Sequence, residues 1–510
     1  MTTDGDGDGD GMESNTAGFD PVEATVAEIH DAFEAGTLTA TALVETTLDR
    51  IDRYDDTLAA YIHVNEDARD RARELDERYA AEGLTGPLHG IPVAVKDNHD
   101  TADMPTSVGS AALADVVPPR DATVVTRLRD AGAIVIGKSN LQELSYGTDT
   151  ISSAGGPTRN PYDTDRRPSG SSGGTAVAVA ATLATLGIGT DTCSSVRSPP
   201  AFTNLVGVRP TMGLVSRTGI APLSLTQDTA GPIARTVVDA ARTLEAMVGY
   251  DPEDPLTARG VGKVPDRGYA AGLDPDALAG ARVGVVRDWF EPTDPANAPD
   301  EEIEAVAATL EAALEELTEA GATLVDPVSI VDDDELAAAR VVDFEFMRDF
   351  DRYLEELGDA APVDSLAALV GTGTMADSIE TRIREGDILS VDVDGLADDP
   401  AYLGALVRRE RLRTQTIDRL VREDLDAVVY PPATVPPVRI PGLQPFSEMR
   451  CQLSAHTGLP AVVVQAGFTD DGLPVGIELL GRPFDERGLL ELAYAYENAT
   501  DHRRPPPAFP

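Results

Sequence analysis

Two serine-rich turns and one lysine are the residues of this sequence best suited to nucleophilic chemistry. The serines lie in Ser169–Ser172 and Ser194–Ser195, and Lys96 ends the apolar run IPVAVK at 91–96. A hydroxyl nucleophile needs a base within reach and hydrogen-bond donors for the oxyanion that forms. A buried lysine can be that base, because burial disfavours the charged ammonium.

The histidines do not suggest a different nucleophilic site. They lie at positions 30, 63, 89, 99, 456 and 502, outside the serine-rich turns, and the chain has no G-x-S-x-G motif. The phosphate-binding pattern G-x-x-x-x-G-K-[ST] is also missing, and no Cys/His spacing indicates a structural zinc site. We therefore predict neither a Ser-His-Asp triad nor a metal site, and we expect no cofactor.

Each candidate also has a structural interpretation when it is taken alone. Lys96 could extend to solvent or pair with Asp97, and the serines of 169–172 could be turn and N-cap residues of the helix that follows. The only lysines in the chain are Lys96, Lys138 and Lys263. Lys96 and Lys138 both lie between residues 86 and 143, the part of the chain that contains the first two segments described below. Chance alone could produce this placement. The joint pattern of several segments decides between these interpretations.

Six segments follow one another in a recognisable order. They are GPLHGIPVAVKDN (86–98), AGAIVIGKSNLQE (131–143), SGSSGGTAVAVA (169–180), GIGTDTCSSVRSPPA (187–201), LVGVRPTMGLVSRTG (205–219) and QDTAGPIARTVVDAA (227–241). Together they resemble the amidase signature family, and LPVGIELLGRPFDE (473–486) resembles the C-terminal part of that family. The resemblance covers about residues 22–505 and is weakest in 250–425.

The resemblance implies a Ser-cisSer-Lys mechanism. Ser195 aligns with the nucleophile, Ser171 with a bridging serine that follows a cis peptide bond, and Lys96 with the base. Backbone N–H groups in 192–195 would form the oxyanion hole, because such donors need no reorganisation during the reaction. The residues assigned to that hole are Thr192, Cys193 and Ser194, and those assigned to structural support are Ser172, Asp191, Arg197 and Lys138.

One segment departs from the family pattern. Cys193-Ser194 stands where the family usually has Gly-Gly before the nucleophile. A side chain there would cost free energy if either position needs a positive φ. Cys193 could instead narrow the pocket. A thiol nucleophile at Cys193 is a weaker alternative, because Ser195 already occupies the matching position.

The surrounding elements predict an α/β fold. Buried strands are expected at 91–96, 133–137, 282–286, 323–325, 426–430, 460–465 and 474–480. Helices are expected at 121–131 with Asp121 as N-cap, within the all-apolar segment 168–189, at 299–320 and at 485–498, with two or three more between 21 and 76. Strands spread over the whole length favour the amidase-signature-type fold, a single large mixed β-sheet flanked by helices on both faces.

The expected domain organisation is simple. Residues 1–19 are an Asp/Gly-rich tail that we expect to be disordered, and 20–510 form a single amidase domain. Its core motifs span 86–241. The acidic section 332–424 is mainly helical without a comparable strand, and it is the best candidate for a cap over the site.

Composition excludes several classes of protein. The chain has 88 acidic and 41 basic residues and a net charge of −47, spread over its whole length. Such a surface repels nucleic acid and keeps a protein soluble in high salt, so we predict a halophilic source. No apolar run is long enough for a membrane span, and the N-terminus lacks a secretory signal. With two cysteines, Cys193 and Cys451, no disulfide framework is expected, and the cytoplasm is the default location.

Three functions follow from these observations. The leading hypothesis is a stand-alone amidase that converts a small-molecule linear carboxamide to a carboxylate and ammonia, for which LSLTQDTAGPIARTV (223–237) is more typical than a S-S-L-D-Q pattern. The alternative is the glutaminase subunit of a glutamyl-tRNA(Gln) amidotransferase, which passes ammonia to a partner enzyme. A further alternative is a non-catalytic binding homologue. The sequence is also compatible with a homodimer.

Overall fold

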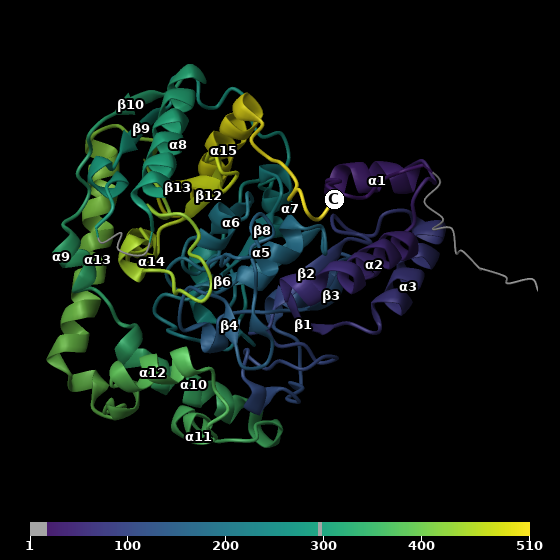
Figure 1. Cartoon of the computed structure of the whole chain (residues 1–510), viewed down its shortest axis with the longest axis horizontal. Helices are drawn as coiled ribbons and strands as arrows, with labels where there is room; N and C mark the ends of the chain where they lie inside the picture. Colours follow the sequence, from purple (N-terminus) through teal and green to yellow (C-terminus); the bar gives the residue numbers. More distant parts are fainter. Residues whose placement is uncertain (1–17, 294–297) are drawn as a thin grey trace, which may run out of the picture.

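The computed structural model describes residues 18–293 and 298–510 (Figure 1). Most of the predicted tail, 1–17, lies outside the described residues. Within them, eleven strands form one mixed sheet. From edge to edge the strands are β1 (Tyr61–Val64), β3 (Ile134–Ser139), β2 (Pro92–Lys96), β6 (Leu186–Asp191), β8 (Thr229–Ala234), β7 (Val206–Arg209), β12 (Ala461–Phe468), β13 (Pro474–Leu480), β11 (Ala427–Tyr430), β9 (Arg282–Val285) and β10 (Thr323–Val325). This confirms the predicted α/β fold.

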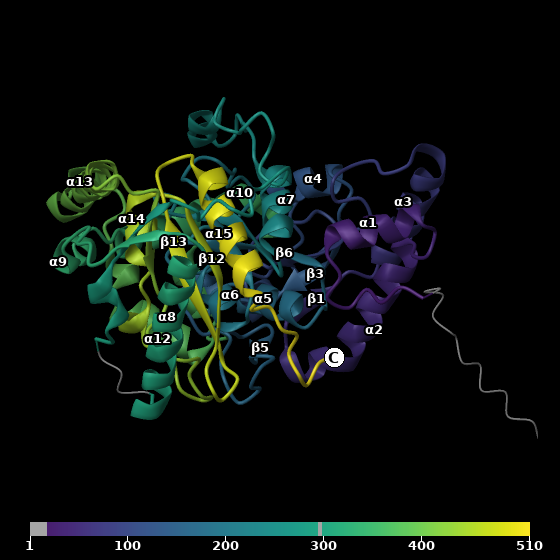
Figure 2. The same ribbon diagram turned by 90° about the horizontal axis from the view of Figure 1, so that it is seen from above.

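Helices cover both faces of this sheet (Figure 2). Those of the first half are α1 (Val26–Glu34), α2 (Ala40–Leu58), α3 (Ala68–Glu82), α4 (Thr123–Asp130), α5 (Gly173–Ala180), α6 (Ser198–Phe202) and α7 (Val237–Met247). Those of the second half are α8 (Asp300–Glu319), α9 (Asp333–Ala337), α10 (Val342–Leu357), α11 (Leu366–Gly371), α12 (Asp377–Glu385), α13 (Pro400–Arg422), α14 (Gln452–Thr457) and α15 (Glu486–Thr500). Both views place α1–α3 at one end of the molecule and α9 and α13 at the other (Figures 1 and 2).

The seven predicted strands are all present, as β2, β3 and β9–β13. The sequence did not predict β1, β6, β7 or β8. The segment 168–189 was interpreted as a buried helix, but α5 ends at Ala180 and β6 begins at Leu186. Every residue of both elements is buried, so hydrophobicity alone does not distinguish the helix from the strand.

The predicted N-cap of α4 is wrong. Ala122 is the N-cap, and no side chain caps this helix. Asp121 instead accepts a hydrogen bond from the Ala102 N–H at 2.8 Å and pairs with Arg129 at 3.2 Å. The carboxylate therefore serves a tertiary contact. Gly132 does lie just past the helix end, with a φ of +93° that favours glycine.

The section 332–424 contains α9–α13 and, among the described residues, no strand. Apolar side chains of α10–α12 pack on loops of the N-terminal half, whereas α9 and α13 contribute side chains to the main core. Phe346 and Phe350 of α10 share a hydrophobic cluster with Val108, Leu144 and Tyr146. This packing holds the helical section beside the loops that follow β2 and β3. Its role as a cap remains a prediction.

Candidate active site

Lys96 and Asp191 end two neighbouring parallel strands. β2 closes with Lys96, β6 closes with Asp191, and the two strands pair in parallel. Carboxyl ends of parallel strands meet at one edge of a sheet, where ligands of α/β proteins commonly bind. Ser171 reaches this edge from the turn before α5, a helix that packs against β2 and β6.

Lys96 is fully buried, and its partners are hydroxyl groups. Its Nζ lies 2.6 Å from Ser171 Oγ and 2.7 Å from Thr190 Oγ1. Burial lowers the pKa of Lys96 to about 7, although the carboxylates of Asp191 and Asp228 oppose the shift. A neutral amine is therefore populated near neutral pH, and it is within reach of a proton on Ser171.

The turn that carries Ser171 is fastened to β6. The Gly170–Ser171 peptide bond is cis, as the family resemblance implies for this serine. Ser172 is the residue before α5, but its hydroxyl does not cap the helix. It donates instead to the Thr190 carbonyl at 3.2 Å. Ser172 thus supports the position of Ser171 beside β6.

Ser195 lies in residues 192–195, called here the oxyanion segment, which leaves β6 and leads to α6. Within the described residues, the backbone N–H groups of Cys193, Ser194 and Ser195 have no hydrogen-bond acceptor. Free N–H donors beside a hydroxyl are what a developing oxyanion requires. No hydrogen bond joins the hydroxyls of Ser195 and Ser171 in the described part of the chain. Such catalytic contacts commonly tighten only when substrate binds.

The two cysteines form a disulfide, which the sequence did not predict. Cys193 and Cys451 are bonded, with their Cα atoms 5.2 Å apart. A nucleophilic thiol at Cys193 is therefore excluded while this bond is intact. Neither Cys193 nor Ser194 has a positive φ, so replacing the usual glycines carries no cost of that kind. The backbone strain that the sequence suggested for Cys193 and Ser194 is therefore absent.

A buried charge cluster supports the oxyanion segment. The Asp191 carboxylate accepts the Val196 N–H at 3.0 Å and pairs with Arg197 at 3.1 Å and Arg209 at 2.6 Å. Burial alone would raise the pKa of Asp191, but the two guanidinium groups hold it below its ordinary value. Arg197 also pairs with Glu478 of β13. The supporting role of Asp191 and Arg197 stays a prediction, and these contacts are compatible with it.

Lys138, the lysine predicted to support the site, has partners different from those of Lys96. Its Nζ lies 3.1 Å from Asp97 Oδ1, 2.6 Å from Thr106 Oγ1 and 3.0 Å from the Pro105 carbonyl. Asp97, which could have paired with Lys96, is therefore the partner of Lys138. The pair ties β3 to the loop that follows β2.

Several contacts at the site were not singled out from the sequence. Thr190 contacts Lys96, and Asn98 Nδ2 donates to Thr190 Oγ1 at 3.0 Å. Thr192 Oγ1 donates to Asp228 Oδ1 at 2.6 Å, and Gln227 Nε2 donates to the Thr192 carbonyl at 2.8 Å. These residues all lie inside the matched motifs, which were the available signal.

A pocket of about 540 Å³ opens beside Ser195 and the oxyanion segment. The predicted cap section contributes Arg340, Val342 and Arg382 to its lining, and Phe446 adds an aromatic surface. Arg340 and Arg382 are the charged side chains of this lining. Such a volume suits a small molecule with both apolar and polar groups.

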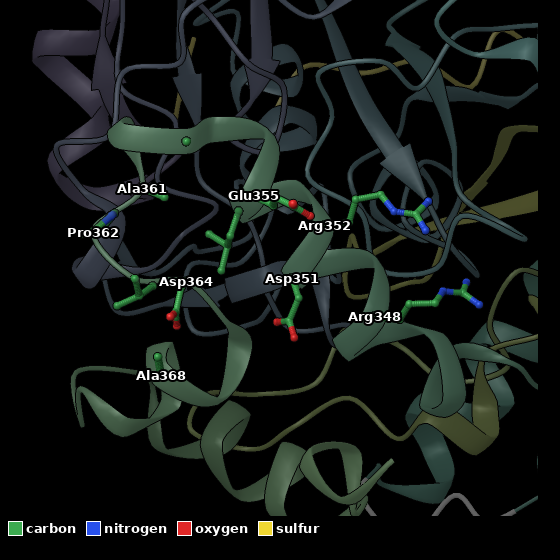
Figure 3. Close-up of a pocket in the computed structure, with 11 residues that line it drawn as sticks. Arg348, Asp351, Arg352, Glu355, Ala361, Pro362, Asp364 and Ala368 are labelled. Atoms are coloured by element: carbon green, nitrogen blue, oxygen red, sulfur yellow. The ribbon is translucent and has the colours of Figure 1, made fainter. Parts of the chain in front are cut away.

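A second hollow, of about 870 Å³, lies on the helical section (Figure 3). Arg348, Asp351 and Glu355 of α10 line it together with the chain around Pro362. None of the residues predicted to act in catalysis lines it. The larger opening is therefore separate from the candidate active site.

Two further observations concern the described residues. In residues 18–293 and 298–510, no group of three or more His, Cys, Asp or Glu side chains could hold a metal ion. In the same residues, no helix combines the length and the apolar character that a membrane crossing demands.

The chain is similar to known proteins over nearly its whole length. The model of the family described as Amidase matches residues 42–490. A glutamyl-tRNA(Gln) amidotransferase subunit from Symbiobacterium thermophilum is 37% identical, over 95% of this chain and 98% of that protein. The structure of native peptide amidase from Stenotrophomonas maltophilia matches with 38% identity and a TM-score of 0.82, over 95% of this chain and 99% of that one. The corresponding glutamyl-tRNA(Gln) amidotransferase subunit from Thermotoga maritima matches with 28% identity and a TM-score of 0.71, over 96% and 97%.

Proposed function

Because this chain belongs to the amidase family, we propose that it hydrolyses a linear carboxamide to a carboxylate and ammonia through an acyl-enzyme on Ser195. One observation carries the proposal: a fully buried Lys96, whose pKa burial lowers to about 7, lies 2.6 Å from the Ser171 hydroxyl at the end of β2. A buried lysine whose hydrogen-bond partners among the described residues are hydroxyls has the environment of a base rather than of a structural charge.

The proposed steps use three side chains. Ser195 Oγ attacks the amide carbon, and its proton passes through Ser171 to the neutral Lys96. The N–H groups of the oxyanion segment stabilise the tetrahedral oxyanion. The Lys96 ammonium then returns the proton to the leaving nitrogen, and ammonia departs. Water attacks the ester by the same relay, which releases the carboxylate and regenerates Ser195.

The pocket suggests which amides to test first. Arg340 and Arg382 offer positive charge to a substrate, although the protein as a whole carries a net charge of −47. Arg340 Nε is already paired with Asp343 Oδ2 at 2.6 Å. The guanidinium carbon of Arg382 lies over the Tyr146 ring, 5.8 Å from its centroid. An acyl chain that ends in a carboxylate would gain a charge-assisted contact there.

Two candidates differ in the fate of the ammonia. Similarity to the solved peptide amidases supports a stand-alone hydrolase that releases ammonia to solution. The named relatives favour the other candidate more directly, because they are amidotransferase subunits, proteins whose name implies further subunits. In that case glutamine is the substrate and ammonia passes to a partner enzyme.

The test is ammonia release by the purified chain in buffers of low and molar salt. The panel contains glutamine, glutaramic acid, its neutral analogue valeramide and a C-terminal peptide amide. Turnover of several amides by the chain alone supports the stand-alone hydrolase. Turnover of glutamine only, with a co-purifying subunit, supports the amidotransferase candidate.

Ser195→Ala is the control for the chemistry in this panel. It should abolish ammonia release and labelling by a fluorophosphonate, which reacts with an activated serine. A wild-type protein that neither labels nor turns over any amide would leave the non-catalytic binding homologue as the remaining interpretation. Wild-type rates in Ser195→Ala would contradict the assignment of the nucleophile.

A further inference from the structure

The disulfide joins two parts of the pocket lining that lie far apart in the sequence. Cys193 belongs to the oxyanion segment, and Cys451 directly precedes α14, whose Gln452 and His456 line the same pocket. The two cysteines are 258 positions apart. The bond therefore fixes the distance between the proposed oxyanion donors and α14.

Hydrogen bonds hold the two ends of the oxyanion segment but not its middle. At its start, Thr192 Oγ1 donates to Asp228 at 2.6 Å. Near its end, the Ser194 carbonyl accepts the Arg197 N–H at 2.8 Å. Between these contacts, Cys193 makes no hydrogen bond with any described residue, and the buried Ser194 hydroxyl has no partner among them. This middle part is attached by the disulfide and by the packing of Cys193 against the apolar cluster around Cys451.

The two sulfur atoms differ in accessibility. Cys451 is 1% exposed and packs in an apolar cluster with Phe202, Met449 and Val463. Cys193 is partly exposed and lines the pocket. A dissolved reagent therefore meets this disulfide from the pocket side, and a molecule bound in the pocket would shield it.

We propose that the Cys193–Cys451 disulfide positions the oxyanion segment, so that the rate of amide hydrolysis depends on the oxidation state of this pair. The proposal rests on the proposed function. A dithiol reductant attacks one sulfur, forms a mixed disulfide and closes to its own disulfide, which leaves two thiols in the protein and transfers two electrons and two protons. Freed of the bond, the N–H groups near Cys193 no longer hold their place beside Ser195.

The experiment compares the full-length enzyme before and after treatment with dithiothreitol. Thiols titrated in denaturant should rise from none to two per chain. The value of kcat should then fall by about tenfold or more, while KM changes by less than about twofold, because the oxyanion exists only in the transition state. Removing the dithiol and reoxidising should restore kcat. A competitive inhibitor in the pocket should slow the appearance of thiols.

The control variant is Cys193→Ser combined with Cys451→Ser. It should have the low kcat of the reduced enzyme and should not respond to dithiothreitol. If this variant does not fold, the value of kcat of the reduced wild-type protein, whose fold is checked by circular dichroism, still tests the proposal. Full kcat in an enzyme with two titrated thiols would overturn the positioning role, as would two free thiols in the protein purified without reductant. An oxidised enzyme that hydrolyses no amide would instead refute the proposed function.

Discussion

Two buried lysines on neighbouring strands have different surroundings. Lys96 ends β2 and Lys138 lies in β3, the two strands pair in parallel, and both side chains are 0% exposed. Lys96 contacts the hydroxyls of Ser171 and Thr190. Lys138 is paired with the Asp97 carboxylate at 3.1 Å. The two lysine side chains are therefore equally buried but differ in the chemical groups that surround them.

The partner decides the role of each lysine. A carboxylate compensates a buried ammonium, and the pair of Lys138 with Asp97 holds β3 to the loop after β2. Hydroxyls compensate it less, and burial lowers the pKa of Lys96 to about 7. The comparison predicts that Lys96 matters mainly for catalysis and Lys138 mainly for stability.

The largest expected effect is that of Lys96→Met. Without the base, kcat/KM should fall by roughly 10²–10⁴-fold, the usual contribution of a positioned general base. The folded structure should remain, because no buried carboxylate loses its partner. Amide hydrolysis at pH 8 and thermal unfolding measure the two quantities. A variant that keeps wild-type kcat/KM would show that Lys96 is not the base.

Lys138→Met is the matched change on the neighbouring strand. It leaves Asp97 buried without its cation, which should lower the free energy of unfolding by about 3–5 kcal/mol. Adding Asp97→Asn should recover part of this loss, because the uncompensated charge is gone. Denaturant unfolding measures both variants. The proposed difference between the two lysines would be contradicted if Lys138→Met left the free energy of unfolding unchanged and lowered kcat/KM as much as Lys96→Met does.

The sequence indicated the candidate catalytic residues but few of their contacts. Lys96, Ser171 and Ser195 were singled out because each lies in a segment with a recognisable motif. The resemblance implied Ser171 as a partner of Lys96, but neither Thr190 nor the pair of Lys138 with Asp97 was predicted. Lys96 and Asp97 are adjacent in sequence, yet their side chains take separate partners. Only the paired strands show which one reaches the carboxylate.

Contacts between distant segments were the other part that the sequence did not predict. Cys193 and Cys451 are separated by 258 residues, so nothing local indicated their bond. Likewise, β6 follows α5 in one continuous buried stretch, and no change in polarity marks the boundary. Strands 282–286 and 426–430 were predicted because each is a short apolar run that follows a charged residue.

A pH profile of kcat/KM tests whether Lys96 is the titrating base. The proposed base must be neutral, and its pKa is about 7, so kcat/KM should fall about tenfold per pH unit below that value and level off above it. The Lys138→Met/Asp97→Asn variant should show the same fall of kcat/KM at low pH, called here the limb of the pH profile. Burial raises the pKa of Asp228 to about 6, so Asp228→Asn tests whether this carboxyl causes the limb instead. A limb that moves in Asp228→Asn but stays in Lys96 variants would contradict the assignment.

Stability should depend on pH through the same group. Because the pKa of Lys96 is about 7 when folded and its ordinary value is 10.5, the unfolded chain binds more protons between these values. The free energy of unfolding should therefore rise with pH across this window. Lys96→Met should lack this contribution, which is measured as the difference in denaturant unfolding between wild type and variant at pH 7 and pH 9.

The smallest expected effects come from one threonine beside each lysine. Thr190 Oγ1 lies 2.7 Å from Lys96 Nζ, and Thr106 Oγ1 lies 2.6 Å from Lys138 Nζ. Thr190→Val removes a hydroxyl that accepts from the Lys96 ammonium, so the pKa of Lys96 should fall further and the limb of the pH profile should move to lower pH. Thr106→Val should leave the limb in place and lower the free energy of unfolding by about 1–2 kcal/mol. Equal shifts of the limb in both variants would mean that the titrating group is shared, and the distinction between the two lysines would not hold.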